Sequence, residues 1–372
     1  MKVLHICSDY IGSKVHCGLY EKLDSLKLEQ TIYTYFHNTN KIGRNRFESS
    51  HTTFYYRPVL KWYHRVLFHL KIRIVYRDIR NNLDIHSHNL THATTLFSDG
   101  AVAYQIYKNF NIPYVVAVRS TDINAFLAYA PHTWCMGLKI LKHAEKIIFI
   151  SPALMENFCK HKLIRYVLPN IRDKFIVQLN GVDDYWLEHV QLTPRETNHN
   201  IIYVGRFDSN KNVVRLVCSV LKIKERYSDI KLHLVGGDGS QHKKIQELIQ
   251  QNPDTLIYHG KVHDKNVLRH LYSQCSIFAM PSIHETFGLV YIEALSQNLK
   301  VLYSKGQGID GLFNQQVGES VNPRSISNIR KALIRLLDTD QAYSSHEVVD
   351  FRQFNWDNIA KRYIDIVYSQ TN

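Results

Sequence analysis

Two glutamates stand out because their neighbours would place both of them where a ligand can bind. Glu285 and Glu293 lie in "HETFGLVYIE" with seven residues between them, among them Gly288. The preceding run "CSIFAMPS" predicts a buried strand that ends near Pro281, and "TFGLVYIEALSQ" predicts the helix that follows. Glu285 is then expected in the loop and Glu293 inside the helix. Carboxylates at these two positions could each accept hydrogen bonds from ligand hydroxyl groups.

The start of this helix predicts an anion site between the two acids. Phe287, Gly288 and Leu289 would present N–H groups that have no partner within the first turn. Such a helix start binds phosphate, and Gly288 allows a phosphate to approach the backbone closely. Glu293 lies roughly 7 Å further along the helix axis. A nucleoside diphosphate sugar has its phosphates between two hydroxyl-bearing parts, so one carboxylate would meet the hexose and the other the ribose.

The cations that such a ligand needs are expected in "VGRFDSNKN". Arg206 directly follows a predicted strand and Lys211 precedes the next helix, so both should lie at the carboxyl end of that strand. Each charge-assisted contact to phosphate would contribute on the order of 1.5–3 kcal/mol and stabilise a leaving diphosphate. Gly236 and Gly237 in "LVGGDGS" would allow close approach of a base or phosphate. The spacing of a dinucleotide-binding glycine loop is absent, which argues against a dehydrogenase.

The elements that position these residues alternate between strand and helix along the chain. Short runs rich in Val and Ile, such as "PYVVAVR" and "KIIFIS", alternate with expected helices over 93–110 and 133–143. This pattern indicates parallel sheets covered on both faces, which bind ligands beyond the carboxyl ends of their strands. The alternation restarts after a polar stretch, 180–200, which contains Pro194 and is the expected hinge.

We therefore expect two doubly wound α/β domains that face a cleft. The first covers 1–180 and binds the acceptor, and the second covers 181–355 and binds the nucleotide sugar. The tail 356–372 carries Trp356, Ile359, Tyr363 and Ile364 on one stripe, so it is expected to be an amphipathic helix that docks on another element.

Composition limits the class of protein. The 372 residues, 45% hydrophobic and 21% charged, are typical of a globular protein with more than one domain. No run approaches a signal peptide or a spanning helix, and the scattered cysteines indicate reduced, mostly buried thiols in a cytoplasmic protein. Residues 1–180 hold 24 Lys and Arg against 12 Asp and Glu, whereas 181–372 hold 22 against 21. The first half is therefore expected to meet an anionic partner.

Taken together, "VGRFDSNKN", "LVGGDGS", "HETFGLVYIEAL" and the closing "FNWDNIAKRY" resemble family four of the glycosyltransferases, retaining enzymes of the GT-B fold. The resemblance is strong over about 200–320 and continuous elsewhere. It implies that Arg206 and Lys211 hold the diphosphate, that Glu285 meets the donor sugar, and that Glu293 meets the ribose. It also implies that the C-terminal helix crosses back onto the first domain.

The first domain departs from the family pattern in two places. The loop "SDYIGSKVHCG" has Gly12 alone where many members have a double glycine, and Gly12 is expected to contribute to donor binding. Arg119, followed by Asp122, stands where many members have a histidine. Some members that build bacterial surface polysaccharides look similar there. Arg119 cannot carry a proton, because its pKa is too high, but it could position the acceptor or neutralise phosphate charge. His88, in "HSHNLTH", would touch the acceptor.

The segment 57–82 combines basic and aromatic residues. On a helix these would suit an anionic membrane surface, although a helix packed on the first sheet with a basic outer face is the other interpretation. No recognised nucleic-acid-binding module is visible. The basic residues are Arg57, Lys61, Arg65, Lys71, Arg73, Arg77 and Arg80.

The sequence thus predicts a retaining hexosyltransferase. It would move a hexose from a nucleotide-diphosphate sugar, with a UDP-sugar preferred, to a hydroxyl of a lipid-linked glycan in surface polysaccharide synthesis. No cofactor or metal is expected, since no Asp-x-Asp motif stands where it would hold a divalent ion. The expected location is the cytoplasm, with peripheral attachment to the inner face of the plasma membrane. The alternatives are a GT-B-type UDP-sugar epimerase and a non-catalytic nucleotide-sugar-binding protein.

Overall fold

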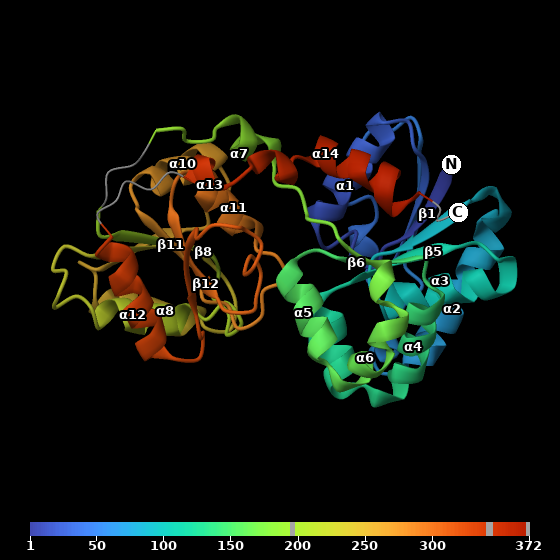
Figure 1. Cartoon of the computed structure of the whole chain (residues 1–372), viewed down its shortest axis with the longest axis horizontal. Coiled ribbons are helices and arrows are strands. Elements are labelled where there is room, and N and C mark those ends of the chain that lie inside the picture. Colours follow the sequence, from blue (N-terminus) through green and yellow to red (C-terminus); the bar gives the residue numbers. More distant parts are fainter. Residues whose placement is uncertain (194–197, 340–344, 370–372) are drawn as a thin grey trace. The chain divides into compact units, whose positions relative to one another are not determined.

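The computed structural model describes residues 1–193, 198–339 and 345–369, with the backbone but not the side chain of Arg65. Pro194, predicted as a turn residue of the hinge, lies outside the described residues. The chain forms two compact units, each with a central sheet and helices packed on it (Figure 1). Unit 1 comprises 1–150, 154–181 and the residues from 356 on, and unit 2 comprises 151–153 and 182–355.

Unit 1 is built on a parallel sheet. Its strands are β1 Lys2–Ile6, β2 Glu29–Tyr35, β3 Thr52–Arg57, β4 Leu90–Ala93, β5 Tyr114–Val118, β6 Lys146–Phe149 and β7 Phe175–Val177. They lie in the order β3-β2-β1-β4-β5-β6-β7. From β1 the chain first adds strands on one side and then, from β4, on the other, so β1 and β4 flank a topological switch point. Strand β5 is buried along its whole length, as expected of a parallel strand covered on both faces.

The helices of unit 1 cover both faces of this sheet. They are α1 Lys14–Ser25, α2 Phe68–Asn82, α3 Ser98–Phe110, α4 Trp134–His143, α5 Pro152–Lys160, α6 Lys162–Val167 and α14 Trp356–Arg362. Figure 1 shows α1 and α14 on one side of the sheet and α2, α3 and α4 on the other. Sequence analysis placed a helix over 93–110, but α3 begins only at Ser98. The Asp122 carboxylate accepts hydrogen bonds from the backbone N–H groups of Leu96 and Phe97, which fixes the preceding turn outside the helix.

The C-terminal segment packs on α1, as expected. Trp356, Ile359 and Tyr363 are buried in one cluster with Leu19 and Leu23 of α1. Lys22 and Asp357 add an ion pair of 3.1 Å across the two helices. The stripe of apolar residues seen in the sequence is therefore the surface by which the C-terminal helix returns to unit 1.

Segment 57–82 is not one helix. Arg57 ends β3, a short 3₁₀ turn spans Trp62–Arg65, and α2 covers the rest. Helix α2 buries Phe68, Ile72, Val75 and Ile79 and packs against α3. The interpretation as a helix packed on the unit is thus confirmed for α2, while the residues before it present their apolar side chains outward.

Unit 2 has a second parallel sheet, in the order β10-β9-β8-β11-β12-β13. Its strands are β8 Asn200–Arg206, β9 Lys231–Gly237, β10 Leu256–Gly260, β11 Ile277–Ala279, β12 Lys300–Ser304 and β13 Gly318–Val321. The helices are α7 Asp184–Glu188, α8 Val213–Leu221, α9 His242–Gln251, α10 Lys265–Ser273, α11 Leu289–Ser296, α12 Ile326–Leu337 and α13 Ser345–Val348. From β8 the chain adds strands first on one side of the sheet and then, from β11, on the other. The switch point of unit 2 therefore lies between β8 and β11.

Burial revises the expectation for the cysteines. The cysteines were expected to be mostly buried, but of the six free thiols only Cys7 and Cys275 are buried, and Cys135 is exposed. Among the described residues, no helix is long and apolar enough to cross a membrane.

Candidate functional site

The switch point of unit 2 gathers the predicted cations and the first glutamate. Arg206 is the last residue of β8, and the loop after β11 carries Glu285. Strands β8 and β11 are parallel neighbours, so residues that follow them lie at the same edge of the sheet. Arg206 is largely exposed there and forms a 3.1 Å ion pair with Asp208.

Lys211 and Glu285 form the most direct contact at this edge. The Lys211 ammonium lies 2.6 Å from Glu285 Oε2, and the two side chains are only 26% and 11% exposed. The Ser282 hydroxyl also donates to Oε2 at 3.3 Å. This partly buried arrangement fixes the carboxylate and leaves the ammonium with further donors for a ligand anion.

Asn210, which the sequence did not single out, ties the loop after β8 to the loop after β11. Its side chain donates to the His284 carbonyl at 2.9 Å and accepts from the His284 N–H at 3.0 Å, and its own carbonyl accepts from the Ile283 N–H at 2.7 Å. These bonds hold Lys211 and Glu285 together although 74 residues separate them.

A glycine-rich loop after β12 forms the other side of Glu285, and its residues are not among those predicted from the sequence. Gly306 and Gly308 have positive φ angles, and the Gly308 N–H donates to the Glu285 carbonyl at 3.0 Å. Gln307 Oε1 accepts from the Glu285 N–H at 3.1 Å. A Cβ on Gly308 would lie 3.1 Å from Glu285 Cγ, so a side chain there would press on the carboxylate. The glycine spacing in "SKGQGIDG" after a predicted strand was the available signal.

The start of α11 has the geometry expected of an anion site. Gly288 is the N-cap with φ of 80°, and a Cβ on it would lie 2.5 Å from the Tyr291 ring. Within the described part of the chain, the N–H groups of Phe287, Gly288 and Leu289 have no hydrogen-bond acceptor. Phe287 itself is buried, so its contribution to a ligand would come from the backbone.

Glu293 lies on the second turn of α11 in a partly buried setting. Burial, followed by the negative charge of Asp183, raises the pKa of Glu293 to about 7 against the opposing effect of Lys265. Asp183 and Lys265 form an ion pair of 2.5 Å with each other. Glu285 and Glu293 thus lie on either side of the start of α11. The carboxyl group of Glu293 titrates near neutral pH.

Gly236 and Gly237 end β9 at the same edge and leave no space for side chains. Their φ angles are 131° and 151°, and a Cβ on Gly236 would lie 1.9 Å from the Gly205 carbonyl oxygen. A Cβ on Gly237 would meet the Tyr258 hydroxyl at 3.3 Å. The two glycines therefore let the ends of β8 and β9 run close together.

In unit 1, Arg119 and Asp122 follow β5 at the carboxyl edge, but Asp122 faces the interior. Its carboxylate accepts from the backbone N–H of Arg119 at 2.8 Å, in addition to the two N–H groups before α3. Burial raises the pKa of Asp122 to about 6, and these N–H groups oppose the rise. The Arg119 guanidinium donates to the Thr94 carbonyl at 3.0 Å. Asp122 therefore shapes the loop, and the Arg119 cation lies close enough to Asp9 and His92 to act on their pKa values.

Gly12 lies in the loop after β1, at the same edge as Arg119. A Cβ on it would lie 2.4 Å from Asp9 Oδ1, so the glycine allows this carboxylate to fold over the loop. The positive charge of Arg119 acts on Asp9, where it opposes the rise in pKa caused by burial.

His88 lies at the opposite end of the sheet from Arg119 and Gly12, just before β4 begins. It is buried, and its ring nitrogens contact the Thr31 hydroxyl at 2.8 Å and the Asp84 carbonyl at 3.0 Å. His88 precedes the first residue of β4, so it lies at the amino edge of the sheet. The expected contact with the acceptor at the carboxyl edge did not take this into account. His92, inside β4, packs with His5 and Tyr368 in the core. Among the described residues, no group of three or more His, Cys, Asp and Glu side chains is placed to hold a metal ion.

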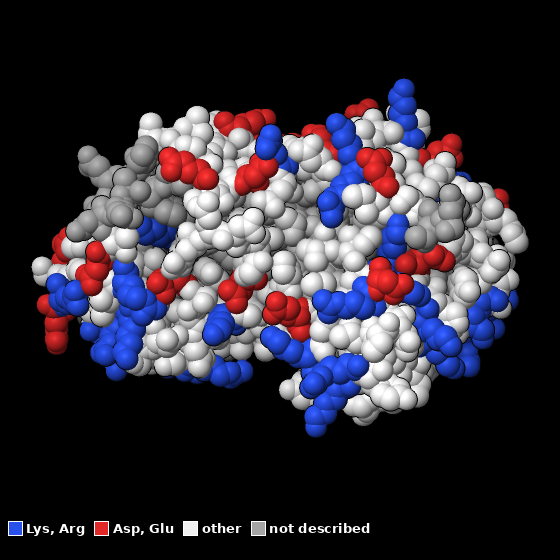
Figure 2. All heavy atoms as spheres, in the orientation of Figure 1, with Lys and Arg blue, Asp and Glu red and all other residues white. Residues whose placement is uncertain are grey.

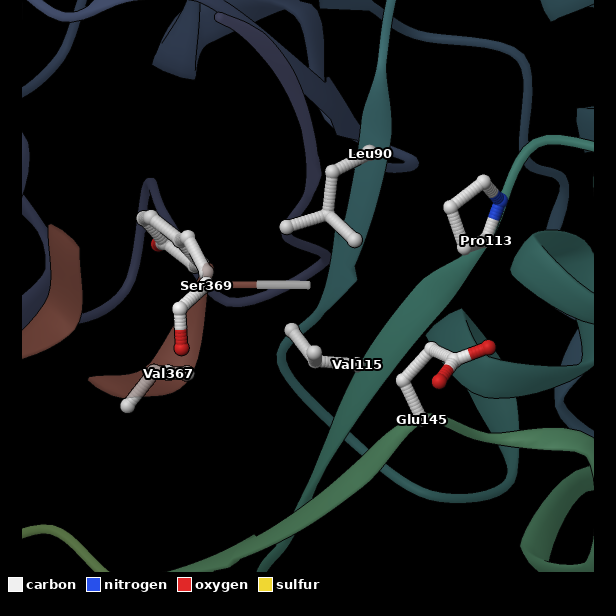
Figure 3. Close-up of a pocket in the computed structure, with 7 residues that line it drawn as sticks. Leu90, Pro113, Val115, Glu145, Val367 and Ser369 are labelled. Carbon is white, nitrogen blue, oxygen red and sulfur yellow. The ribbon is translucent and has the colours of Figure 1, made fainter. Parts of the chain in front are cut away.

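A cavity of about 200 Å³ also lies at the amino ends of the unit 1 strands (Figure 3). Leu90, Pro113 and Val115 line it from β4 and β5, and Val367 and Ser369 line it from the C-terminal segment. Lys146 donates to the Ser369 carbonyl at 2.7 Å and so holds that segment in place. The cavity lies at the edge of the sheet away from Arg119 and is part of how the chain's end docks.

The chain is similar to known glycosyltransferases in sequence and in fold. Residues 184–347 match the family "Glycosyl transferases group 1". An uncharacterized glycosyltransferase of Methanocaldococcus jannaschii is 24% identical over 278 residues, 68% of this chain and 69% of the relative. A lipopolysaccharide 1,2-N-acetylglucosaminetransferase of Salmonella typhimurium is 24% identical over 188 residues, 46% of this chain and 49% of the relative.

The fold is similar to that of a solved protein over its full length. HepE from Anabaena, solved in complex with UDP and glucose, superimposes with a TM-score of 0.65 at 15% identity, covering 99% of this chain and 100% of that one. Both parallel sheets and the returning C-terminal helix belong to this GT-B architecture. The chain therefore has the GT-B fold, and its residues 184–347 belong to the glycosyltransferases of group 1, a family of retaining hexosyltransferases.

Proposed function

We propose that this glycosyltransferase moves a hexose from a UDP-sugar to a hydroxyl of a lipid-linked glycan in surface polysaccharide synthesis. The observation that carries the donor assignment is the grouping of Lys211, Glu285 and the unpaired N–H groups before α11 at one switch point. The UDP bound in HepE and the lipopolysaccharide acceptor named for the Salmonella relative support the donor and acceptor classes.

In this proposal unit 2 binds the donor, and its cationic, N–H and carboxylate groups each bind a different part of it. Lys211, Arg206 and the N–H groups of Phe287 to Leu289 bind the diphosphate, since cations and helix starts attract anions. Glu285 accepts hydrogen bonds from the hexose hydroxyls, and Glu293 accepts them from the ribose. Gly236 and Gly237 allow the nucleotide to approach the backbone. We assign the acceptor to unit 1, where Arg119 positions it, Asp122 holds the Arg119 loop, and Gly12 leaves room for the donor.

The transfer breaks the bond between the anomeric carbon and the diphosphate oxygen and forms a bond from that carbon to the acceptor oxygen. The departing diphosphate carries the new negative charge and takes the acceptor's proton, so no protein base is needed. Lys211 and the α11 N–H groups stabilise that charge as it develops, which lowers the barrier. The Lys211–Glu285 pair keeps the cation in place before substrate binds.

The lipid-linked acceptor would be reached at a membrane surface. On the face drawn in Figure 2, Lys and Arg side chains gather in several patches rather than on one continuous face. The membrane attachment that we propose therefore depends on the segment before α2, where Trp62, Val66 and Leu67 are exposed among basic residues. Co-flotation with anionic liposomes that weakens with added salt would support it, and no flotation would contradict it.

The donor is tested by a thermal-shift screen of nucleotide sugars, followed by product analysis with lipid-linked acceptors. Glu285→Gln should lower turnover by at least about 100-fold and change UDP affinity much less, because the amide cannot carry the charge that pairs with Lys211. Glu225→Gln, on the exposed surface of unit 2, is the matched control. An unchanged rate in Glu285→Gln, or epimer formation from UDP-N-acetylglucosamine without acceptor, would contradict the proposal.

A further inference from the structure

A cavity of about 380 Å³ opens in unit 1 beside the segment that precedes α2. It is lined by His37, Leu60, Lys61, Trp62, His64 and Lys71. Its walls follow β2 and β3, and the Leu60 N–H donates to the Phe36 carbonyl at 3.0 Å, which joins the two walls. The cavity therefore lies at the carboxyl edge of the sheet, where parallel α/β units bind ligands. Its volume is that of a small-molecule site.

Lys71 supplies this cavity with a partly buried positive charge that lacks an anion. Its ammonium donates to the neutral Ser98 hydroxyl at 2.7 Å and lies 5.6 Å from the centre of the Phe68 ring. Among the described residues no carboxylate approaches it within ion-pair distance. The two nearest acids are committed elsewhere, because Asp99 accepts from Tyr35 and Thr94 and Asp122 accepts from backbone N–H groups. A cation held in such a setting favours an anionic ligand.

His64 adds an unused donor beneath the same cavity. The ring is 2% exposed, and its Nδ1 accepts the Lys61 N–H at 2.9 Å, so the neutral ring carries its proton on Nε2. Nε2 is buried and forms no hydrogen bond within the described residues. Burial, with the charges of Lys61 and Lys71, lowers the pKa of His64, so the ring stays neutral. An acceptor oxygen drawn in by Lys71 would satisfy this N–H group.

Large apolar side chains are exposed in the segment that borders the cavity. Trp62 is 75% exposed, and Val66 and Leu67 beyond it are 78% and 48% exposed. Exposed side chains of this kind clustered beside cations are typical of sites for molecules with a charged head and a hydrocarbon tail. The six lining residues include no acid, so a negative head group meets no repulsion there.

We infer that this cavity is the subsite that holds the phosphate and the first carbons of the hydrocarbon chain of the acceptor lipid. The inference rests on the lipid-linked acceptor of the proposed function. Lys71 and Lys61 bind the phosphate, His64 contributes a hydrogen bond, and Leu60 and Trp62 contact the chain. The glycan attached to that phosphate then extends from the subsite along the carboxyl edge of the sheet.

The test uses 6-bromohexyl phosphate as a probe, because its bromine lies close enough to the phosphate to quench the fluorescence of Trp62. Quenching should saturate in the wild type and disappear in Trp62→Phe. Lys71→Met should weaken the binding about tenfold, since it removes the charge and keeps most of the apolar volume, and His64→Asn should weaken it about threefold. Lys108→Met, on the exposed end of α3, is the matched control and should bind as the wild type does. Thermal melts confirm that each variant is folded.

Three outcomes overturn the inference. The first is equal binding of 6-bromohexanol, which would mean that the phosphate is not recognised. The second is a wild-type affinity in folded Lys71→Met. The third is quenching by brominated anionic phospholipid vesicles but not by the free alkyl phosphate, which would make the cavity a general membrane contact. Displacement of the probe by inorganic phosphate at high concentration supports the phosphate subsite. UDP affinity, measured in the same samples, separates a failure here from a failure of the donor assignment.

Discussion

Glu293→Gln provides a test of how the second turn of α11 is built. The pKa of Glu293 rises from its ordinary 4.5 to about 7, first through burial and then through Asp183. At about 1.4 kcal/mol per tenfold change in the equilibrium, ionising this carboxyl costs about 3 kcal/mol more in the folded protein than in the unfolded chain. The folded state therefore holds the proton more tightly. Stability should fall as the pH rises from 4.5 through 7, and glutamine removes that loss.

The expected size follows from this linkage. Of the roughly 3 kcal/mol, about 2 kcal/mol falls between pH 5.5 and pH 8. For a unit of this size, that corresponds to about 4–8 °C in the melting temperature. In scanning calorimetry of the nucleotide-free protein, the melting temperature of Glu293→Gln relative to that of the wild type should therefore rise by this amount between pH 5.5 and pH 8.

The control for this prediction is Glu225→Gln, an exposed glutamate of the same unit. Its melting temperature should stay at a constant offset from that of the wild type at both pH values. If the curves of Glu293→Gln and the wild type also run parallel, the carboxyl is not a group that burial keeps protonated, and the argument for its environment fails.

The remaining predictions concern ligand linkage and packing. If the ribose requires ionised Glu293, UDP binding at pH 7 should release about half a proton, seen by calorimetry in buffers of different ionisation enthalpy, and Glu293→Gln should release none. In denaturant melts, Gly236→Ala should destabilise the protein by at least about 3 kcal/mol, because it combines a strained φ with a clash against Gly205. Gly260→Ala, with open space around it, should cost only about 1 kcal/mol. Trp356→Ala should cost about 3–5 kcal/mol, since the ring fills the contact with α1, and Trp62→Ala, on the surface, should change stability little; equal losses would contradict the docking of the C-terminal helix.

Much of the architecture follows from local patterns. Short Val- and Ile-rich runs that alternate with helices can be buried only in parallel sheets, and both sheets are parallel throughout. Gly288 between a strand and an apolar run predicted a helix start open to a ligand, and it is the N-cap of α11. The apolar stripe of the C-terminal segment predicted that it docks on another element, because an amphipathic helix must bury its apolar face.

The site itself depends on hydrogen bonds between distant residues, which no local pattern encodes. Asn210 and Gln307 hold Glu285 in place from two other loops, and neither would be chosen from the sequence. Asp122 accepts hydrogen bonds from backbone N–H groups that are distant in the sequence, because the turn before α3 lies next to it.

The sequence by itself determined the two α/β units, the types of the residues that we propose bind the donor, and the presence of a helix start beside them. Only the tertiary structure decided which edge of each sheet a residue occupies, as the separation of His88 from Arg119 shows. The reason is that side-chain type and spacing follow the local period of a strand or helix, whereas strand order and loop contacts are fixed by packing between elements far apart in the chain.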